Sequence, residues 1–94
     1  MSQAPLNPFR RKQAIKTILE TLSMAGTFAL EQSRLVGFAN DLIKPPLDES
    51  EQDGIIELLK KGKFIVMVPD ELDDQLVQWV ITDHGRSHLL SISN

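Results

Sequence analysis

Two histidines near the end of the chain have a spacing that could hold a metal ion. His84 and His88 lie four positions apart, with Asp83 beside them, and on a helix this spacing lets two imidazoles share one ion. The sequence places no third ligand and contains no H-E-x-x-H motif. We therefore expect no bound metal, and we interpret both histidines as exposed or as capping polar groups near the terminus.

The other polar residues do not form a catalytic group. The chain has no cysteine and therefore no thiolate nucleophile, and no serine, histidine and acid grouping stands out. The five glycines lie apart, which argues against a glycine-rich phosphate loop. Acid–base catalysis needs a positioned pair of groups in a pocket, whereas the carboxylates here occur in runs typical of a solvated surface. We expect a non-enzymatic protein without a cofactor.

Acidic residues cluster in two stretches that could bind a partner. They are Asp48 and Glu51, with Glu49 and Asp53 beside them, at the start of a predicted helix, and Asp70, Glu71, Asp73 and Asp74 in a predicted loop. Solvation and the helix dipole account for such acids without any function. The functional interpretation is a negatively charged surface that binds a basic protein partner or mimics nucleic acid.

Basic residues form two further groups. They are Arg10, Arg11, Lys12 and Lys16 in the first predicted helix, and Lys60, Lys61 and Lys63 at the end of the third. A solvated surface again explains them. The alternative is contact with a phosphate backbone, which would give salt-dependent and weakly specific binding. The formal net charge of −3 weighs against this alternative, because compact nucleic-acid binders usually have a basic balance.

The elements that would position these residues fit one small domain. With 94 residues, of which 41% are hydrophobic and 24% charged, the chain suffices for one modest core and has an ordinary globular composition. We expect a loose tail over residues 1–7 and a single domain over residues 8–94. The sequence has neither the apolar core of a signal peptide nor a run of membrane-spanning length. We therefore expect a cytoplasmic protein without a membrane partner.

Apolar periodicity predicts a first helix that begins at Pro8 and ends near Gly26. Asn7 can cap its free N–H groups, Pro8 suits its first turn, and Gly26 suits its C-cap. Its buried stripe has the i, i+3, i+4, i+7 spacing of an amphipathic helix. The stripe consists of Ile15, Ile18, Leu19 and Leu22.

A second helix is predicted from a Thr27 cap to Lys44, where two prolines end it. Its apolar stripe repeats the same spacing and consists of Leu35, Phe38, Ala39 and Leu42. Gly37 inside this helix costs about 1 kcal/mol against alanine. We therefore expect a neighbouring element to pack closely against Gly37.

A third helix is predicted to start at Asp48, whose spacing to Glu51 matches a capping box. Ser50 and Asp53 give an alternative register. Gly62 suits the end of this helix, and two lysines before it complement the dipole. The predicted buried side consists of Ile55, Ile56, Leu58 and Leu59.

Two β-prone runs follow, residues 64–68 and residues 76–81. The acidic loop between them, Pro69 to Gln75, is short enough for an antiparallel pair. If Gln78 faces water, the alternating positions of the second run face the core, namely Val77, Trp79 and Ile81. Thr82 is expected to cap a short last helix.

This order of elements resembles the winged helix-turn-helix superfamily over about Pro8 to Leu90. The best local match is Trp-Val-Ile-Thr-Asp-His-Gly-Arg at residues 79–86. It is similar to the second wing strand and final helix of many winged-helix regulators, which often read aromatic-x-leucine-threonine-x-x-glycine there. The resemblance implies an α+β, mostly helical fold: three helices, a β-hairpin wing and a short C-terminal helix. It also implies that the third helix enters the DNA major groove and that the wing contacts the DNA.

Both of those DNA-contacting elements would be acidic here, and like charges oppose their approach to phosphates. We therefore favour a non-enzymatic regulatory module that binds a protein partner through the acidic wing and third helix. The alternative is a DNA-binding transcriptional regulator that contacts phosphates through the first helix and the Lys60–Lys63 group. A homodimer is a further possibility, because winged-helix regulators often pair through terminal helices. Phe9 and Met24 leave apolar surface near the ends of the first helix.

Overall fold

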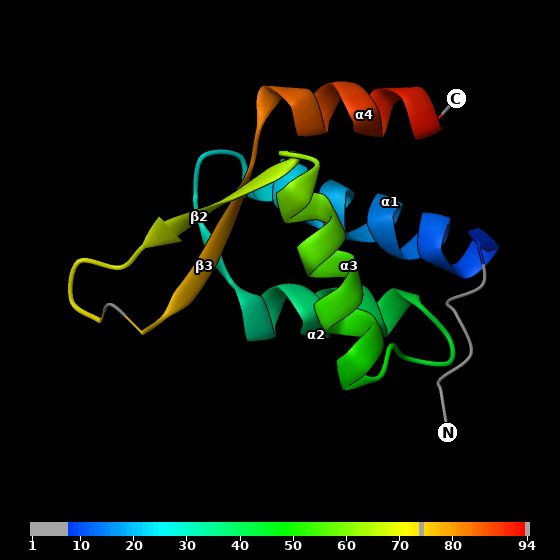
Figure 1. Ribbon diagram of the computed structural model, residues 1–94, viewed down its shortest axis with the longest axis horizontal. Helices are drawn as coiled ribbons and strands as arrows, with labels where there is room; N and C mark the ends of the chain where they lie inside the picture. The colour runs from blue at the N-terminus through cyan, green and yellow to red at the C-terminus, as the bar shows by residue number, and fades with distance from the viewer. Residues whose placement is uncertain (1–7, 74, 94) are drawn as a thin grey trace.

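Four helices and a three-stranded antiparallel sheet make up the described part of the chain, residues 8–73 and 75–93 of a computed structural model (Figure 1). In chain order the elements are α1 (Pro8–Ala25), β1 (Leu30–Glu31), α2 (Gln32–Leu42), α3 (Glu49–Lys61), β2 (Ile65–Pro69), β3 (Val77–Ile81) and α4 (Asp83–Ser93). This order confirms the predicted α+β, mostly helical fold with a hairpin wing and a C-terminal helix. The predicted tail over residues 1–7 and the Asn7 cap lie outside the described residues.

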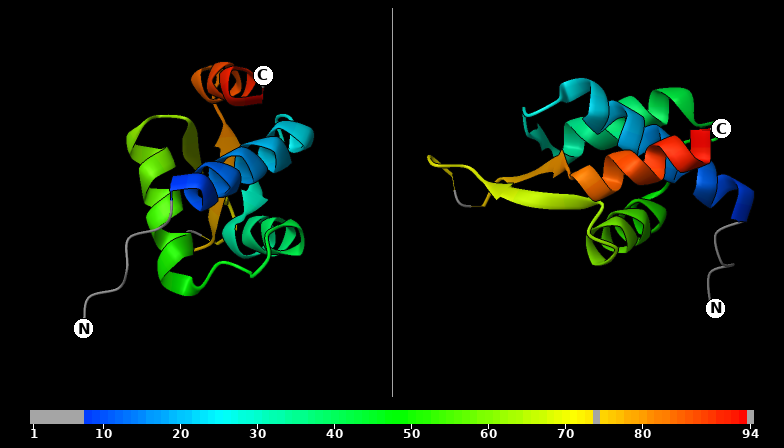
Figure 2. Two further views of the ribbon diagram at one scale, coloured as in Figure 1. Left: turned by 90° about the vertical axis from the view of Figure 1, so that its right-hand side faces the viewer. Right: turned by 90° about the horizontal axis from the view of Figure 1, so that it is seen from above.

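Helix α1 lies at the centre of the molecule and packs against α2, α3, α4 and β3 (Figures 1 and 2). Its predicted stripe is buried except for Ile15, which is half-buried, and Ala14 is buried with it. Gly26 follows the helix with a φ of +67°, and its N–H donates to the carbonyl of Leu22 at 3.1 Å. Glycine tolerates this left-handed conformation better than other residues. The predicted end of the first helix is confirmed.

Helix α2 begins later than predicted, because a strand precedes it. Residues 26–28 form a turn, and β1 then pairs antiparallel with β3, with Leu30 opposite Trp79 and Glu31 opposite Gln78. The prediction of a helix start at Thr27 is therefore wrong. A strand of two residues leaves no alternation to detect in the sequence, and its partner strand lies far along the chain.

Only half of the apolar stripe predicted for α2 is buried. Leu35 and Ala39 are fully buried, whereas Phe38 is 53% exposed and Leu42 is 70% exposed. The prediction of close packing at Gly37 is also wrong within this chain, because an added Cβ would meet nothing within 4 Å. The outward side of α2 therefore combines exposed apolar side chains with a glycine that has open space above it.

Helix α3 begins with the predicted capping box. The backbone N–H of Glu51 donates to Oδ1 of Asp48 at 2.8 Å, and the backbone N–H of Asp48 donates to Oε1 of Glu51 at 3.1 Å. Its buried residues are Ile55, Ile56 and Leu59. Leu58, predicted for the same side, is 43% exposed. Gly62 is the C-cap as predicted, but its φ is −75° and the left-handed residue is Lys63, with a φ of 62°, so the conformational freedom of glycine does not define this end of α3.

The wing is a hairpin of β2 and β3 that extends away from the helices (Figure 1). Ile65 pairs with Ile81 at its base, and Pro69 pairs with Val77 at its outer end. Pro69 belongs to β2 rather than closing the run. The strand order β1–β3–β2 makes β2 an edge strand, which tolerates a residue without an N–H. Trp79 and Ile81 are buried as predicted, whereas Val77 at the outer end is 37% exposed.

Thr82 and Gly85 hold the turn from β3 into α4. The Thr82 hydroxyl donates to the carbonyl oxygen of Lys63 at 2.7 Å and accepts from the backbone N–H of Gly85 at 2.9 Å, which confirms the predicted cap. A Cβ at Gly85 would lie closer to the carbonyl oxygen of Phe64 than real contacts allow. The Thr-x-x-Gly spacing therefore fixes the start of α4 against the backbone that enters β2.

Gly85→Ala is expected to destabilise the fold by about 1–3 kcal/mol, because the added methyl group meets backbone that cannot rotate away. Gly54→Ala is the matched control. Gly54 lies inside α3 with nothing within 4 Å of an added Cβ, so this substitution should stabilise the protein by about 1 kcal/mol. Urea denaturation measures both free energies of unfolding. A Gly85→Ala variant as stable as the wild type would contradict the close approach at Gly85.

Candidate interaction surface

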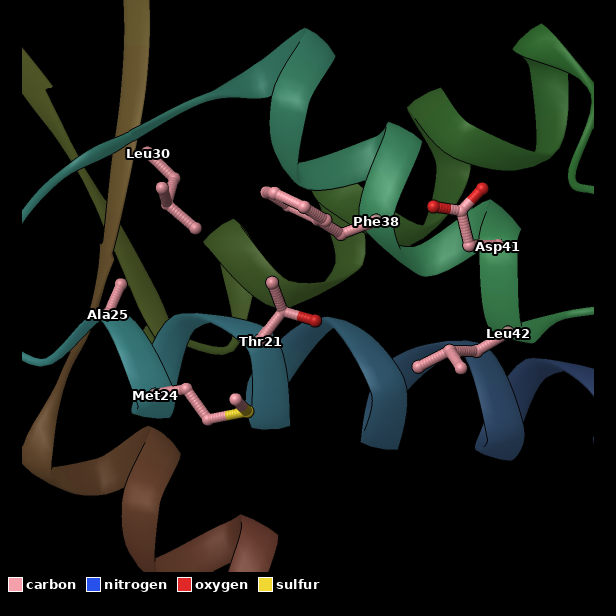
Figure 3. Close-up of a pocket in the computed structure, with 7 residues that line it drawn as sticks. All are labelled: Thr21, Met24, Ala25, Leu30, Phe38, Asp41 and Leu42. Carbon is pink, nitrogen blue, oxygen red and sulfur yellow. The ribbon is translucent and has the colours of Figure 1, made fainter.

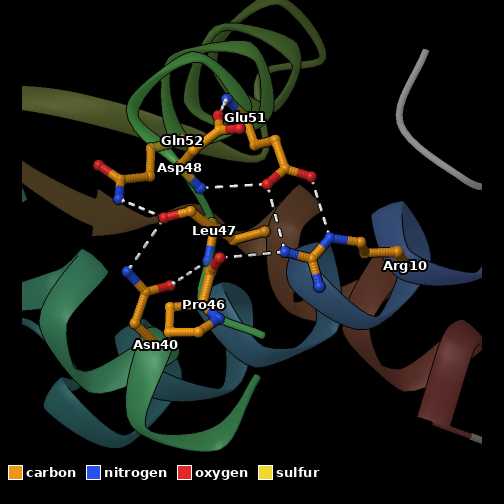
Figure 4. Close-up of polar contacts among 7 residues, drawn as sticks. All are labelled: Arg10, Asn40, Pro46, Leu47, Asp48, Glu51 and Gln52. Atoms are coloured by element: carbon orange, nitrogen blue, oxygen red, sulfur yellow. Dashed lines mark hydrogen bonds and ion pairs between the residues drawn. The ribbon is translucent and has the colours of Figure 1, made fainter. Parts of the chain in front are cut away.

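An ion pair connects α1 to the start of α3 (Figure 4). Nε of Arg10 donates to Oε2 of Glu51 at 2.9 Å, and Nη2 of Arg10 donates to Oε1 at 3.2 Å, which is a bidentate contact. Nη2 also donates to the carbonyl oxygen of Pro46 at 3.2 Å. The two side chains are only 20% and 23% exposed. Arg10 was predicted to contact phosphate, and Glu51 was predicted to belong to the acidic surface. In the structure the two side chains bind each other instead.

Asn40 fixes the loop that leads into α3. Its side-chain oxygen accepts from the backbone N–H of Leu47 at 3.0 Å, and its side-chain nitrogen donates to the carbonyl of Leu47 at 3.4 Å. The side chain of Gln52 donates to the same carbonyl at 2.8 Å (Figure 4). Leu47 itself is buried. Together with the ion pair, these contacts set the positions of α1, α2 and α3 relative to one another.

The ion pair lowers the pKa of Glu51. The hydrogen bond from Arg10 is the largest cause, the hydrogen bond from the backbone of Asp48 acts in the same direction, and burial opposes both. The same side-chain hydrogen bond raises the pKa of Arg10. A carboxyl group whose pKa is lowered by folding stabilises the fold above its unfolded pKa. That contribution is lost as the pH falls through the folded pKa.

A groove of about 380 Å³ lies where the starts of α2 and α3 meet the wing. Three acids line it, Glu31 at the end of β1 and Glu49 and Asp53 on α3, and the wing contributes residues 75–77. Ser33 donates to a carboxylate oxygen of Glu31 at 2.7 Å. The described residues that line the groove include no arginine or lysine. The surface at these two helix starts is therefore negatively charged.

Carboxylates also continue along the outside of α3 at every fourth position. Glu49, Asp53 and Glu57 are all exposed, and their spacing places them on one side of the helix. Lys60 forms only a loose ion pair with Glu57, with 4.0 Å between Nζ and Oε2. Glu57 is missing from the predicted acidic surface, although its spacing from Asp53 could have revealed it.

At the wing tip, carboxylates hold the turn together. Oδ1 of Asp70 accepts from the N–H groups of Leu72 and Asp73, at 2.7 and 3.2 Å, and Oδ1 of Asp73 accepts from the N–H two residues further on at 3.0 Å. Aspartates commonly form turns in this way, so these two acids have a structural role. Glu71 is exposed, and Asp74 lies outside the described residues.

The predicted basic residues lie in two separate places. One group occupies the N-terminal half of α1, and the other lies at the C-terminal end of α3, roughly 14 Å along the helix from Glu51. Besides Arg10, the groups consist of Arg11, Lys12 and Lys16, and of Lys60, Lys61 and Lys63. All of these six are exposed except Lys16, which is half-buried. Arg34 on α2 is also exposed and was not among the predicted contacts.

His84 and His88 both stack on Phe64, with ring centroids 4.7 and 4.4 Å from its own. This stack connects α4 to the turn before β2. The described residues contain no group of three or more histidines, aspartates or glutamates that could hold a metal ion. None of the helices in residues 8–73 and 75–93 is long and apolar enough to cross a membrane.

Comparison with solved structures relates the fold to that of transcriptional regulators. A protein assigned as a transcriptional regulator in Thermoplasma acidophilum matches with a TM-score of 0.73 and 16% identity, over 92% of this chain and 80% of that one. One assigned in the same way in Pseudomonas aeruginosa matches with a TM-score of 0.66 and 20% identity, over 85% of this chain and 56% of that one. A MarR family transcription regulator matches with a TM-score of 0.68 and 14% identity, over 89% of this chain and 55% of that one.

These matches confirm the resemblance at the level of the fold. At identities of 14–20% they show the fold alone. This chain spans little more than half the length of the Pseudomonas and MarR family proteins. No protein-family model and no curated protein matches the sequence.

Glu51→Gln tests the ion pair through its dependence on pH. Glutamine still closes a capping box, but it removes the charge that faces Arg10. Because folding lowers the pKa of Glu51, the wild type should lose more free energy of unfolding than the variant between about pH 6 and about pH 3. Glu49→Gln, an exposed change on the same helix, is the control and should follow the wild type. Urea denaturation at both pH values measures the free energy of unfolding of the wild type and the two variants. An equal decrease in all three proteins would contradict the role of the ion pair.

Proposed function

We propose that this chain is a non-enzymatic transcriptional regulator of the winged-helix type that binds duplex DNA. The observation that supports the proposal is the likeness in fold to proteins assigned as transcriptional regulators and to a MarR family member. This likeness favours DNA binding over the protein-interaction module that the acidic residues favour in the sequence. The proposal concerns the domain seen here, which spans only part of two of those proteins.

The charges of the molecule restrict how it would approach DNA. In a winged-helix protein, α3 and the wing would lie nearest to the duplex, and here their exposed residues include Glu49, Asp53 and Glu71. A carboxylate about 4 Å from a phosphate is repelled by about 1 kcal/mol in water, and by more where water is excluded. Deep insertion of the start of α3 into the major groove is therefore unfavourable.

Two exposed cations of α1 are available to contact phosphates. Arg11 and Lys12 are exposed, and neither forms an ion pair with another described residue. Arg10 is engaged by Glu51, and Lys60 has Glu57 nearby. We therefore assign phosphate contact to Arg11 and Lys12, with Lys16 half-buried beside them on the same helix. Such contacts give affinity and orientation without reading the base sequence.

The acidic groove supports a second candidate function, the binding of a basic protein segment. Glu31, Glu49 and Asp53 converge on this groove from the starts of two helices. A segment rich in lysine or arginine would complement their charge. Reversing these three charges should abolish capture of such a partner and leave DNA binding unchanged or stronger, so the two functions can be separated by mutation.

DNA binding is measured by fluorescence anisotropy with a labelled duplex of random sequence. The two contacts assigned to Arg11 and Lys12 predict that affinity falls about 12-fold between about 50 mM and about 200 mM salt, because bound counterions are released on binding. Absence of binding at the lower salt concentration would contradict the proposal and favour the basic-partner alternative.

Two double variants locate the contact. Arg11→Ala with Lys12→Ala should reduce affinity about tenfold or more and flatten the salt dependence, since each lost phosphate contact lowers the slope by about one unit. Lys60→Ala with Lys61→Ala removes the same amount of charge at the far end of α3 and should have a much smaller effect. Equal losses in the two variants would contradict a contact centred on α1.

A further inference from the structure

The outward face of α2 has a composition that the single chain does not explain. Arg34, Gly37, Phe38 and Asp41 have the spacing i, i+3, i+4 and i+7, which places them on one side of the helix. All four are exposed. Gly37 lowers helix propensity, yet a Cβ there would meet nothing within 4 Å. The solvent-exposed side of α2 thus combines a large apolar side chain, a glycine and two opposite charges.

The two charges on this face lie at the ends of α2 where the helix dipole disfavours them. Arg34 is in the first turn and Asp41 is in the last turn of the helix, whereas the dipole favours anions at the N-terminus and cations at the C-terminus. Neither side chain forms an ion pair with another described residue. Their placement does not contribute to the stability of the single chain.

An apolar groove of about 450 Å³ adjoins this face, between α1 and α2 (Figure 3). Met24, Phe38 and Leu42 line it and are 88%, 53% and 70% exposed. Figure 3 shows Phe38 extending from α2 toward Leu30 across the groove. These side chains leave on the order of 400 Å² of apolar surface exposed. That is about half of the ~800 Å² that each partner contributes to a standard interface, and the polar side of α2 can supply much of the rest.

We propose that this face pairs with the same face of a second copy of the chain. A two-fold axis passing between Gly37 and Phe38 would set the two α2 helices antiparallel. Because Arg34 and Asp41 lie equally far on either side of that axis, each Arg34 faces the partner's Asp41, and each Phe38 faces the partner's Gly37. The absence of a side chain at Gly37 lets the two helices approach closely.

A second copy suits this face because the face is complementary to itself. An isologous interface requires that every feature meet its complement through the two-fold axis, and one positive and one negative charge placed symmetrically about an apolar centre satisfy this condition. The same axis places both α1 helices on one side of the α2 pair, so that the two apolar grooves meet. The pairing does not depend on whether the domain binds DNA or a basic partner.

Charge reversal tests the pairing by sedimentation. Arg34→Asp sets two acids against each other at both ends of the interface, and Asp41→Arg sets two arginines against each other. Each single variant should therefore be monomeric at about 100 µM, where the wild type is expected to be dimeric. The double variant restores both pairs and should dimerise again. An equal mixture of the two single variants should form a heterodimer, because the acids of one copy then face the arginines of the other.

Two further variants serve as controls. Lys61→Asp makes the same charge change at the end of α3 and should leave the dimer intact. Gly37→Ala has room within the single chain, so the monomer should stay folded by circular dichroism while the dimer dissociation constant rises about tenfold from crowding at the axis. A monomeric wild type, or a folded double variant that stays monomeric, would overturn the proposal. A wild-type dimer that neither single charge reversal weakens would place the interface elsewhere and overturn it too.

Discussion

The position of α3 depends on the contact between Arg10 and Glu51. Glu51 caps its own helix and binds a guanidinium of α1 at the same time, so the start of α3 cannot shift relative to α1 without losing the ion pair. Asn40 adds a third attachment through the backbone of Leu47. The surface formed by the starts of α2 and α3 is therefore held in place, and its acidic character is a fixed property of the molecule.

This constraint also separates the charges that hold the fold together from those that remain available to a partner. Among the acids, Asp48 and Glu51 cap α3, and Asp70 and Asp73 form the wing turn. Among the cations of α1, the ion pair engages Arg10 and leaves its two neighbours exposed. The residues left for recognition are consequently a different set from the one that charge clusters in the sequence suggest.

Much of the fold could be predicted because it is specified by short-range signals. The capping box at Asp48, the left-handed Gly26 and the Thr82 cap each depend on residues within four positions of one another. Strand β1 depends on pairing with Trp79 and Gln78, and Arg10 meets a residue 41 positions away. Such pairings leave no periodic pattern in the sequence. Periodicity likewise identified Phe38 as part of an apolar stripe, but it cannot show whether another element covers that stripe.

In the proposed function, DNA meets the cations of α1 rather than the acidic start of α3. The most direct test is to follow backbone amide NMR shifts while a short duplex is titrated into the protein. If DNA binds in this way, the largest changes occur around Arg11 and Lys12, and the amides of Glu49 and Asp53 change little. Large changes at the start of α3 and in the wing, or no changes at all, would contradict this mode of binding.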